Sequence, residues 1–249
     1  MTAWLGMDPG QDRGRIERCI RNLVDVFRES IDLLEKQHWY PGDPLSPIWW
    51  GGLGDPLEII VTAILVKLSR WRSALDSLES MRKSGLLDLR RLSSANPEDL
   101  ARVIRGVGFP RSKARTIVEI ARYIERSGGL GAISRRGAEE IRRELMDIDG
   151  IGRETADSIL LFALNKPVFP AARLSMRVLE RFCGSGVEGY ESMRRAVEET
   201  LGWDLYSLKL LHAGLTTIAS KYCRRSMPKC GQCPLVGLCI YGGRSRSSL

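Results

Sequence analysis

The sequence predicts an all-α protein, and three observations support that fold class. Apolar residues recur at the spacing of three and four that marks one face of a helix, no stretch alternates with the period of two that marks a strand, and capping residues punctuate the helical stretches. The clearest case begins at Asn96, a favoured N-cap, continues with Pro97 at the first helical position and ends at Gly106. A chain of 249 residues can bury its core in one domain or in two compact lobes.

Helices are therefore expected along most of the chain. The segments with helical periodicity are residues 14–36, 56–66, 70–84, 97–105, 111–127, 137–146, 154–164, 173–183, 190–201 and 204–221. After the first of them comes a stretch rich in Pro, Gly and Trp, residues 39–56, which predicts a linker or a pocket-forming loop.

The formal net charge is +8 at pH 7. A surplus of Lys and Arg favours a polyanionic partner, because these side chains neutralise phosphates and release counterions. No stretch reaches the roughly 18 consecutive apolar residues of a membrane span, and the first residues lack the basic and apolar regions of a signal peptide. We therefore expect a cytoplasmic, nucleoid-associated monomer that binds nucleic acid and makes no membrane contact.

Four of the six cysteines lie close together in the pattern C-x6-C-x2-C-x5-C. Zinc sites usually offer two closely spaced pairs, whereas this pattern has one close pair and two outlying cysteines. It therefore favours a [4Fe-4S] cluster over zinc or free thiols. The expected ligands are Cys223, Cys230, Cys233 and Cys239.

Three basic residues lie in the first loop between these cysteines: Arg224, Arg225 and Lys229. A rigid, positive loop suits contact with DNA phosphates, and the alternative is a merely solvated basic surface. The remaining cysteines, Cys19 and Cys183, fall in helical patterns and are expected to be core thiols.

A glycine hairpin is expected between residues 137–146 and a helix that starts near Glu154. Its backbone N–H groups, bare at Gly150 and Gly152, can approach a phosphate at the helix N-terminus. The expected DNA-binding residues of the hairpin are Gly150, Ile151, Gly152, Arg153 and Thr155.

The hairpin and the four-cysteine pattern together resemble the helix-hairpin-helix DNA glycosylases of the endonuclease III type, over nearly the whole chain. The stretch "LHAGLTTIASKYCRRSMPKCGQCPLVGLCIY" is similar to the cluster segment of that family, "VIRGVGFPRSKARTIVEIA" to its preceding helix pair and "DPLEIIVTAILVKLSRW" to its early barrel helix. The resemblance implies base excision, in which DNA is bent, a damaged nucleotide is flipped into a pocket between two helical lobes and its N-glycosidic bond is cut. One lobe would be a helical barrel, residues 55–163, and the other would combine residues 14–54 and 164–249 with the cluster.

Two positions in the resemblance decide the chemistry. Bifunctional members have a Lys just after the hairpin, which attacks the sugar and forms a Schiff base. This chain has Glu154 there, which is either part of the site or an ordinary helix-start stabiliser, so strand cleavage is disfavoured. Lys67 or Lys166 could act only weakly in its place.

The second position carries an Asp in the family, which stabilises the oxocarbenium-like sugar and helps to activate water. Ala172 occupies this position, next to Ala171. A methyl group can do neither, so we expect an impaired or inactive catalyst. Either the natural protein lost the acid and recognises DNA without cutting, or the chain is a knockout of an Asp enzyme, which the intact surroundings favour. The possible substitute acids are Asp147, Asp149 and Asp157.

Aromatic residues precede the early barrel helix. Trp49, Trp50 and Trp39 are expected to line a base pocket, because aromatic faces can sandwich an extruded base, and an electron-poor alkylated base gains cation–π attraction. This pattern resembles 3-methyladenine DNA glycosylase III, a monofunctional branch of the superfamily. The alternative is that these tryptophans pack a core.

Relatives often insert a Gln into the gap that the flipped base leaves. This chain reads "VKLS" from Val66 to Ser69, so Lys67 or Leu68 is expected to be the wedge.

These observations predict a monofunctional DNA glycosylase that removes a damaged base, preferably alkylated and possibly deaminated, from double-stranded DNA. The alternative is a non-catalytic lesion-binding protein of the same fold. An electron-transfer protein is disfavoured, since such a chain seldom needs a basic hairpin and a long helical scaffold.

Overall fold

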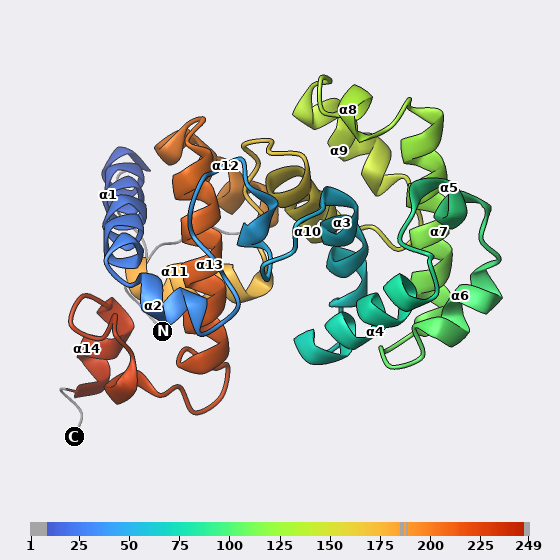
Figure 1. Cartoon of the computed structure of the whole chain (residues 1–249). Helices are drawn as coiled ribbons and strands as arrows, with labels where there is room; N and C mark the ends of the chain where they lie inside the picture. The colour runs from blue at the N-terminus through green and yellow to red at the C-terminus, as the bar shows by residue number, and fades with distance from the viewer. Residues whose placement is uncertain (1–8, 185–186, 188, 247–249) are drawn as a thin grey trace. The chain divides into compact units, whose positions relative to one another are not determined.

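The computed structural model describes residues 9–184, 187 and 189–246, and within these ranges the chain is all-helical with no strand (Figure 1). This confirms the predicted fold class. The chain divides into two compact units, one formed by Leu45–Pro170 and the other by Met1–Pro44 with Ala171–Leu249. Among the described residues, no helix is both long enough and apolar enough to cross a membrane.

The unit Leu45–Pro170 is built around a helix with almost no exposed side chains, α3, which packs on α4, α7 and a π-helical turn. Asp55 starts α3 by accepting a hydrogen bond from Leu57 N at 2.7 Å. A second layer pairs α7 with α5 and α6. The helices are α3 (Pro56–Leu65), α4 (Trp71–Lys83), α5 (Leu89–Ser94), α6 (Pro97–Val103), α7 (Pro110–Arg126), α8 (Leu130–Ile133), α9 (Ala138–Met146) and α10 (Arg153–Ser158), with a 3-10 turn at Pro47–Trp49 and the π-helical turn at Ile159–Ala163.

The other unit is centred on α13, which packs against α1, α11 and α12. Gly214 lets α1 approach α13 closely, because a Cβ at this position would clash with the ring of Phe27. The helices are α1 (Pro9–Arg28), α2 (Ile31–Glu35), α11 (Arg173–Cys183), α12 (Tyr190–Leu201), α13 (Leu205–Lys221) and α14 (Ile240–Arg246), with a 3-10 turn at Cys230–Gln232.

A disulfide joins Cys19 in α1 to Cys183 at the end of α11. Their Cα atoms are 5.7 Å apart, although 164 positions separate them in the sequence. The prediction of two core thiols was therefore wrong, because the two helical patterns meet in space. The bond ties together the two sequence segments of this unit.

The boundaries differ from the sequence-based ones in three ways. The first predicted helix breaks at Ser30 into α1 and α2. The short helices α5, α8 and α14 were not predicted, since four to seven residues carry too little periodicity. Residues 45–54 and 164–170, expected in the second lobe, pack with the unit Leu45–Pro170.

Candidate functional site

The glycine hairpin forms as the sequence predicts, between α9 and α10. Gly150 adopts φ +88°, and a Cβ there would clash with Oγ1 of Thr116, which donates a hydrogen bond to Asp149 O at 2.9 Å. Only glycine fits both constraints. Ile151 is buried and anchors the tip in the core, while Gly152 is exposed.

Gly152 is the N-cap of α10 and supplies no side-chain cap. The first hydrogen bond along the helix is from Ala156 N to Gly152 O, at 3.0 Å, so the N–H groups before it point out of the helix start. Arg153 and Glu154 are exposed in this first turn, and Thr155 is buried. The arrangement offers backbone donors and one guanidinium to an anion, next to one carboxylate.

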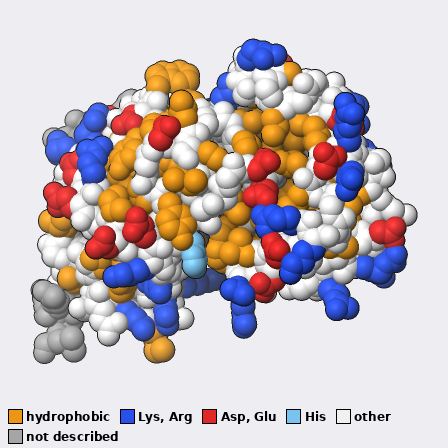
Figure 2. All heavy atoms as spheres, in the orientation of Figure 1, with side chains coloured by type: hydrophobic (Ala, Val, Ile, Leu, Met, Phe, Trp, Pro, Cys, Tyr) orange, Lys and Arg blue, Asp and Glu red, His pale blue; other side chains and the backbone are white. Residues whose placement is uncertain are grey.

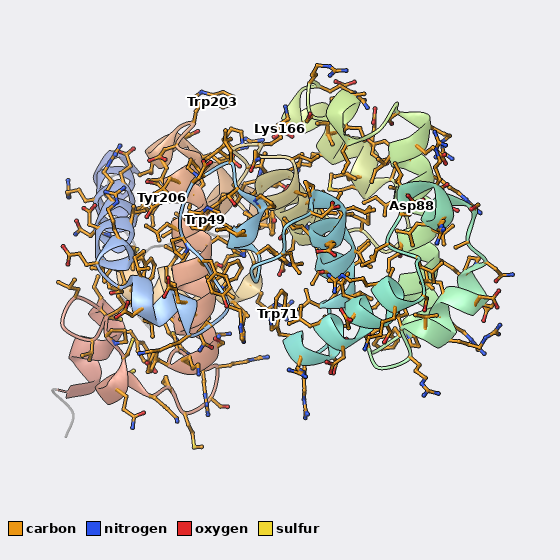
Figure 3. The ribbon with its side chains drawn as sticks, in the orientation of Figure 1. Trp49, Trp71, Asp88, Lys166, Trp203 and Tyr206 are labelled. Atoms are coloured by element: carbon orange, nitrogen blue, oxygen red, sulfur yellow. A yellow bond between two sulfur atoms is a disulfide. The ribbon has the colours of Figure 1, made fainter. Side chains whose placement is uncertain are left out.

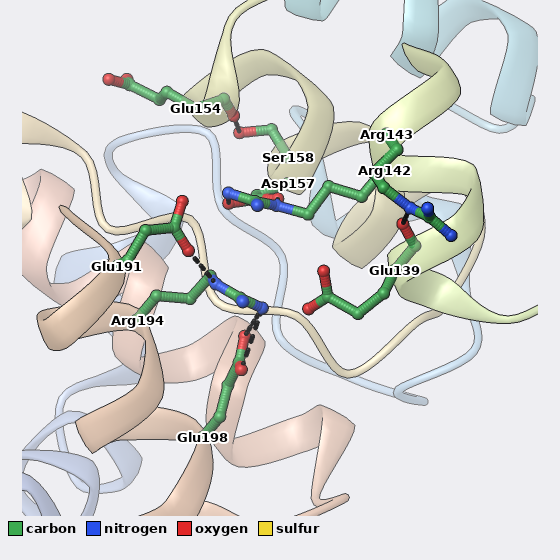
Figure 4. A network of polar contacts seen from close by, with 9 residues as sticks. All are labelled: Glu139, Arg142, Arg143, Glu154, Asp157, Ser158, Glu191, Arg194 and Glu198. Carbon is green, nitrogen blue, oxygen red and sulfur yellow. Dashed lines mark hydrogen bonds and ion pairs between the residues drawn. The ribbon is translucent and has the colours of Figure 1, made fainter. Parts of the chain in front are cut away.

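A buried ion pair lies beneath the hairpin. Arg142 in α9 donates to both carboxylate oxygens of Asp157 in α10, at 2.6 and 3.2 Å, as Figure 4 shows. Asp157 is 0 % exposed, so this carboxylate holds the two hairpin helices together and is excluded as a substitute acid. Asp147 and Asp149 are exposed beside the hairpin.

Glu154 does not join that pair. In Figure 4 its side chain points away from Asp157, and the polar contact drawn from it is its main-chain oxygen accepting from Ser158 Oγ at 2.8 Å. The two lysines considered as alternative amines are both hydrogen-bonded to carbonyls: Lys67 Nζ to Gly150 O at 3.3 Å, and Lys166 Nζ to Arg136 O at 2.7 Å.

The expected wedge loop presents Leu68, which is 79 % exposed and held at φ +53°. A second apolar side chain, Phe109, is 69 % exposed at φ +55° where α7 begins. Left-handed backbone is uncommon for such residues and is typical of functional sites. Sequence reasoning missed Phe109, although a bulky residue between Gly108 and the Pro110 that starts a helix was a signal.

The loops that carry these two side chains are fastened together. Ser69 Oγ accepts from Gly108 N at 3.0 Å and from Lys113 Nζ at 2.8 Å, and the same ammonium donates to Leu65 O at 2.7 Å. Burial, followed by the positive charge of Lys67, lowers the pKa of Lys113 to about 8. Leu68 and Phe109 are thus presented on one braced surface, the wedge surface.

The position of the family acid falls at the start of α11. Ala172 is the N-cap residue of this helix, with φ −54° and ψ 148°, and it is 4 % exposed. Ala171 is also buried. The first turn of α11 therefore has no side-chain cap from position 172.

The four clustered cysteines line a single apolar cavity together with Arg181, Tyr222 and Tyr241. All four are partly buried free thiols. Burial raises the pKa of Cys233 to about 11 and also raises the pKa of Cys239, and repulsion from neighbouring thiolates of the group adds to both shifts. In the described part of the chain, no group of three or more His, Cys, Asp or Glu side chains is arranged to hold a metal ion.

The basic loop between the first two cysteines is shaped by α11. Arg181 donates to Arg224 O at 2.8 Å, to Arg225 O at 3.2 Å and to the Sγ of Cys223 at 3.4 Å. Arg177 donates to Cys223 O at 2.8 Å. The side chains of Arg224, Arg225 and Lys229 are exposed. On the face drawn in Figure 2, acidic side chains lie among the Lys and Arg side chains.

The tryptophans assigned to a base pocket are mostly enclosed. Trp49 is 0 % exposed, and Trp50 packs against Trp71 and Phe162 with ring centroids 6.2 and 5.0 Å apart. Trp39 packs edge-on against His212 at 5.6 Å. The ring contacts of Trp50 favour the core alternative for this residue, and the pocket role of all three stays a prediction. Figure 3 shows that Trp203, not predicted for any site, projects from the turn between α12 and α13 instead.

Comparison with known proteins identifies the family of the chain. Residues 63–202, more than half of the chain, match the family model described as HhH-GPD superfamily base excision DNA repair protein. A thymine-DNA glycosylase of Aeropyrum pernix is 28% identical over 240 residues, which are 92% of this chain and 96% of that protein.

Two solved structures share the fold. The 3-methyladenine DNA glycosylase of Helicobacter pylori, bound to 1,N6-ethenoadenine, has a TM-score of 0.65 at 20% identity, over 80% of this chain and 97% of its own. A trapped endonuclease III–DNA covalent intermediate has a TM-score of 0.65 at 19% identity, over 94% of this chain and 98% of its own.

Proposed function

Because the chain belongs to the HhH-GPD superfamily of base excision DNA repair proteins, we propose that it is a monofunctional N-glycosylase that frees a damaged base from duplex DNA without cutting the strand. The observation that carries this proposal is the hairpin itself: an intact phosphate-binding turn followed, at position 154, by a carboxylate and not an amine. A carboxylate cannot form a Schiff base with the sugar.

The residues that grip DNA in this proposal come from the unit Leu45–Pro170. The N–H groups at the start of α10 and the side chain of Arg153 bind a phosphate. Leu68 and Phe109 enter the duplex and hold open the step that the flipped nucleotide leaves. Lys67, whose ammonium donates to Gly150 O, joins the wedge surface to the hairpin.

The chemical step needs a group that stabilises positive charge on the sugar. Ala172 supplies none, and loss of one well-placed electrostatic group commonly lowers the rate by about 10²- to 10³-fold. The chain as written therefore binds and flips its substrate but releases the base slowly.

We also propose that the four cysteines hold a [4Fe-4S] cluster. Although the described side chains are not grouped as metal ligands, all four thiols line one apolar cavity, and cysteine thiolates are the donors that such a cluster uses. A cluster bound there would cross-link the loop that carries the four cysteines. Arg181 and Arg177 already hold that loop in a shape that exposes Arg224, Arg225 and Lys229 to phosphate.

The substrate proposed first is an alkylated purine, and a deaminated pyrimidine is the next choice. The first rests on the predicted pocket role of Trp39, Trp49 and Trp50, of which only Trp39 is more than slightly exposed. The second is supported by the similarity to the Aeropyrum thymine-DNA glycosylase.

A second function is favoured by one observation, the alanine at position 172: a lesion-binding protein that does not cut. In that case Ala172 is the native residue, and the intact hairpin and wedge surface serve recognition alone.

A duplex panel separates these functions. Labelled duplexes with an alkylated purine, uracil, thymine opposite guanine or an oxidised base are incubated with the chain and with the Ala172→Asp variant, and each sample is analysed with and without alkali. We expect cleavage of one lesion class only after alkali, and chiefly by the variant. Cleavage without alkali would contradict the monofunctional assignment, and tight lesion binding with no release by either protein would support the lesion-binding function.

A further inference from the structure

A buried hydroxyl in the first turn of α11 lacks a hydrogen-bond partner. Ser175 is 0 % exposed, and its Oγ finds no partner in the part of the chain that the structure describes. Some other helical hydroxyls in this protein donate to the carbonyl four residues earlier, as Ser158 does to Glu154 O at 2.8 Å and Thr200 does to Ala196 O at 2.6 Å. Leaving a buried hydroxyl unpaired is costly, so this one calls for a physical explanation.

The start of α13 shows what such a hydroxyl can do. Asp204 is the N-cap of that helix, and its Oδ1 accepts from Ser207 N at 3.1 Å while its Oδ2 accepts from Ser207 Oγ at 2.6 Å. The carboxylate therefore satisfies both donors of a buried serine at the third helical position. This is a capping arrangement in which the helix start and the serine hold one acid.

The start of α11 has the same register with the acid missing. Residues 204–207 read Asp-Leu-Tyr-Ser, and residues 172–175 read Ala-Arg-Leu-Ser. Ala172 is the N-cap with extended ψ, and Ser175 is the third helical residue. Side chains of a helix lean toward its N-terminus, so the Ser175 hydroxyl lies over the turn that begins at position 172.

We propose that the N-terminus of α11 is built to hold a carboxylate at position 172 and that Ser175 is the positioning residue for it. The backbone N–H and the hydroxyl of Ser175 both donate to that carboxylate, fix its rotamer and keep it ionised beside the positive end of the helix. This inference rests on the proposed function, which identifies position 172 as the place of the catalytic acid. It implies that the fold of this chain is adapted to an acid that the sequence no longer contains.

A double-mutant cycle tests the coupling without any need for activity. Ser175→Ala is made in the chain as it is and in the Ala172→Asp variant, and thermal unfolding of each full-length protein is followed. In the present chain, loss of the unpaired hydroxyl raises the unfolding midpoint. In the Ala172→Asp background the same change lowers the midpoint, because the carboxylate loses a donor.

Two matched controls exist in the same unit. Thr217 is 1 % exposed and its Oγ1 is also without a partner among the described residues, so Thr217→Val should change the midpoint equally in both backgrounds. Ser207→Ala should lower it in both, because Asp204 loses its donor either way. If Ser175→Ala has the same sign in both backgrounds, as Thr217→Val does, the positioning role is wrong.

A kinetic comparison completes the test in the Ala172→Asp background. Ser175→Ala should lower kcat for base release and leave KM unchanged, because the hydroxyl contacts the acid and not DNA. Ser175→Thr, which keeps the hydroxyl, should retain most of kcat. A fall caused equally by both changes would contradict positioning by the hydroxyl. If the Ala172→Asp variant releases no base although the midpoints show the sign reversal, the proposed function fails and the inference about Ser175 stands.

Discussion

The two regions that a glycosylase needs differ sharply in this chain. In the unit Leu45–Pro170, buried polar contacts hold the hairpin and the wedge surface, among them the Arg142–Asp157 pair and the hydrogen bond from Lys113 to Ser69. At the start of α11, by contrast, the buried hydroxyl of Ser175 has no partner among the described residues, and the side chain at position 172 is only a methyl group. Under the proposed function, this difference means that DNA binding and the chemical step are carried by separable parts of the molecule.

The largest expected effect comes from supplying the missing carboxylate. Ala172→Asp should raise the rate of base release by about 10²- to 10³-fold, since it adds one well-placed negative charge. It should change lesion affinity little. Single-turnover release from a lesion duplex measures the first quantity, and fluorescence anisotropy measures the second.

Ala172→Asn is the matched control for that change. Its side chain can also cap α11, but it cannot ionise. A rate increase with Asn equal to that with Asp would show that helix capping, and not charge, limits the present chain.

The next largest effect is expected from a substitution in the hairpin. Gly150→Ala forces a side chain onto φ +88°, which costs about 1–3 kcal/mol of backbone strain, and displaces Thr116 from Asp149 O, which costs about 1 kcal/mol more. Stability and DNA affinity should fall together. Thermal unfolding and a salt titration of binding measure both.

Gly152→Ala offers the comparison within the same turn. A Cβ at Gly152 meets nothing within 4 Å, and its φ is −94°, so the variant should fold as the parent does. Equal destabilisation by the two substitutions would contradict the account of the hairpin.

Loss of the Cys19–Cys183 disulfide, at the C-terminal end of α11, should lower the stability of the protein and change its DNA affinity little. Reduction, or Cys19→Ser, removes a link that closes a long loop, and such links contribute about 2–4 kcal/mol. We expect a lower unfolding midpoint under reducing conditions in the parent and no further change in Cys19→Ser. A midpoint that is insensitive to reductant would exclude a stabilising disulfide.

The wedge surface should give a smaller, lesion-specific effect. If the wedge surface enters the duplex as proposed, Phe109→Ala removes a stacking ring and costs about 1–3 kcal/mol in lesion affinity, and Leu68→Ala removes an apolar wedge and also lowers this affinity. Affinity for undamaged duplex should hardly change. Leu238→Ala removes another exposed leucine, in the other unit, and serves as the control.

The smallest effect is a dependence of stability on pH. The pKa of Lys113 is lowered to about 8 in the folded protein, below the 10.5 of the free side chain, so the unfolded chain binds more protons between these values. Its contribution to stability therefore rises as pH increases from about 8 to 10.5. In denaturant titrations, Lys113→Met should make the rise of stability with pH less steep. Part of the rise should remain in this variant, because burial also lowers the pKa of Lys209 to about 8. An unchanged slope in Lys113→Met would contradict the assignment.

The sequence was sufficient where a residue type is forced by local geometry. Gly150 of the hairpin, the cap at Asn96 and the span of α11 follow from backbone constraints and periodicity, and the structure confirms them. The family membership was predicted from two motifs and is confirmed by the family match.

The features that sequence reasoning missed depend on which residues the fold brings close together. The Cys19–Cys183 bond joins residues far apart in the chain, and the exposure of Phe109 follows from how two loops are tied through Ser69. The unpaired state of Ser175 was also hidden, since a serine in an amphipathic helix ordinarily back-bonds to a carbonyl. Burial of Trp49 shows the reverse case, where an aromatic signal for a pocket fits a core equally well.

The most direct test of the separation between grip and chemistry is base flipping by the chain as it is. Duplexes with 2-aminopurine beside a lesion report unstacking as a rise in fluorescence. We predict the same rise with the present chain and with Ala172→Asp, on the lesion that the variant excises. No rise with the present chain, or equal affinity for damaged and undamaged duplex, would contradict the account.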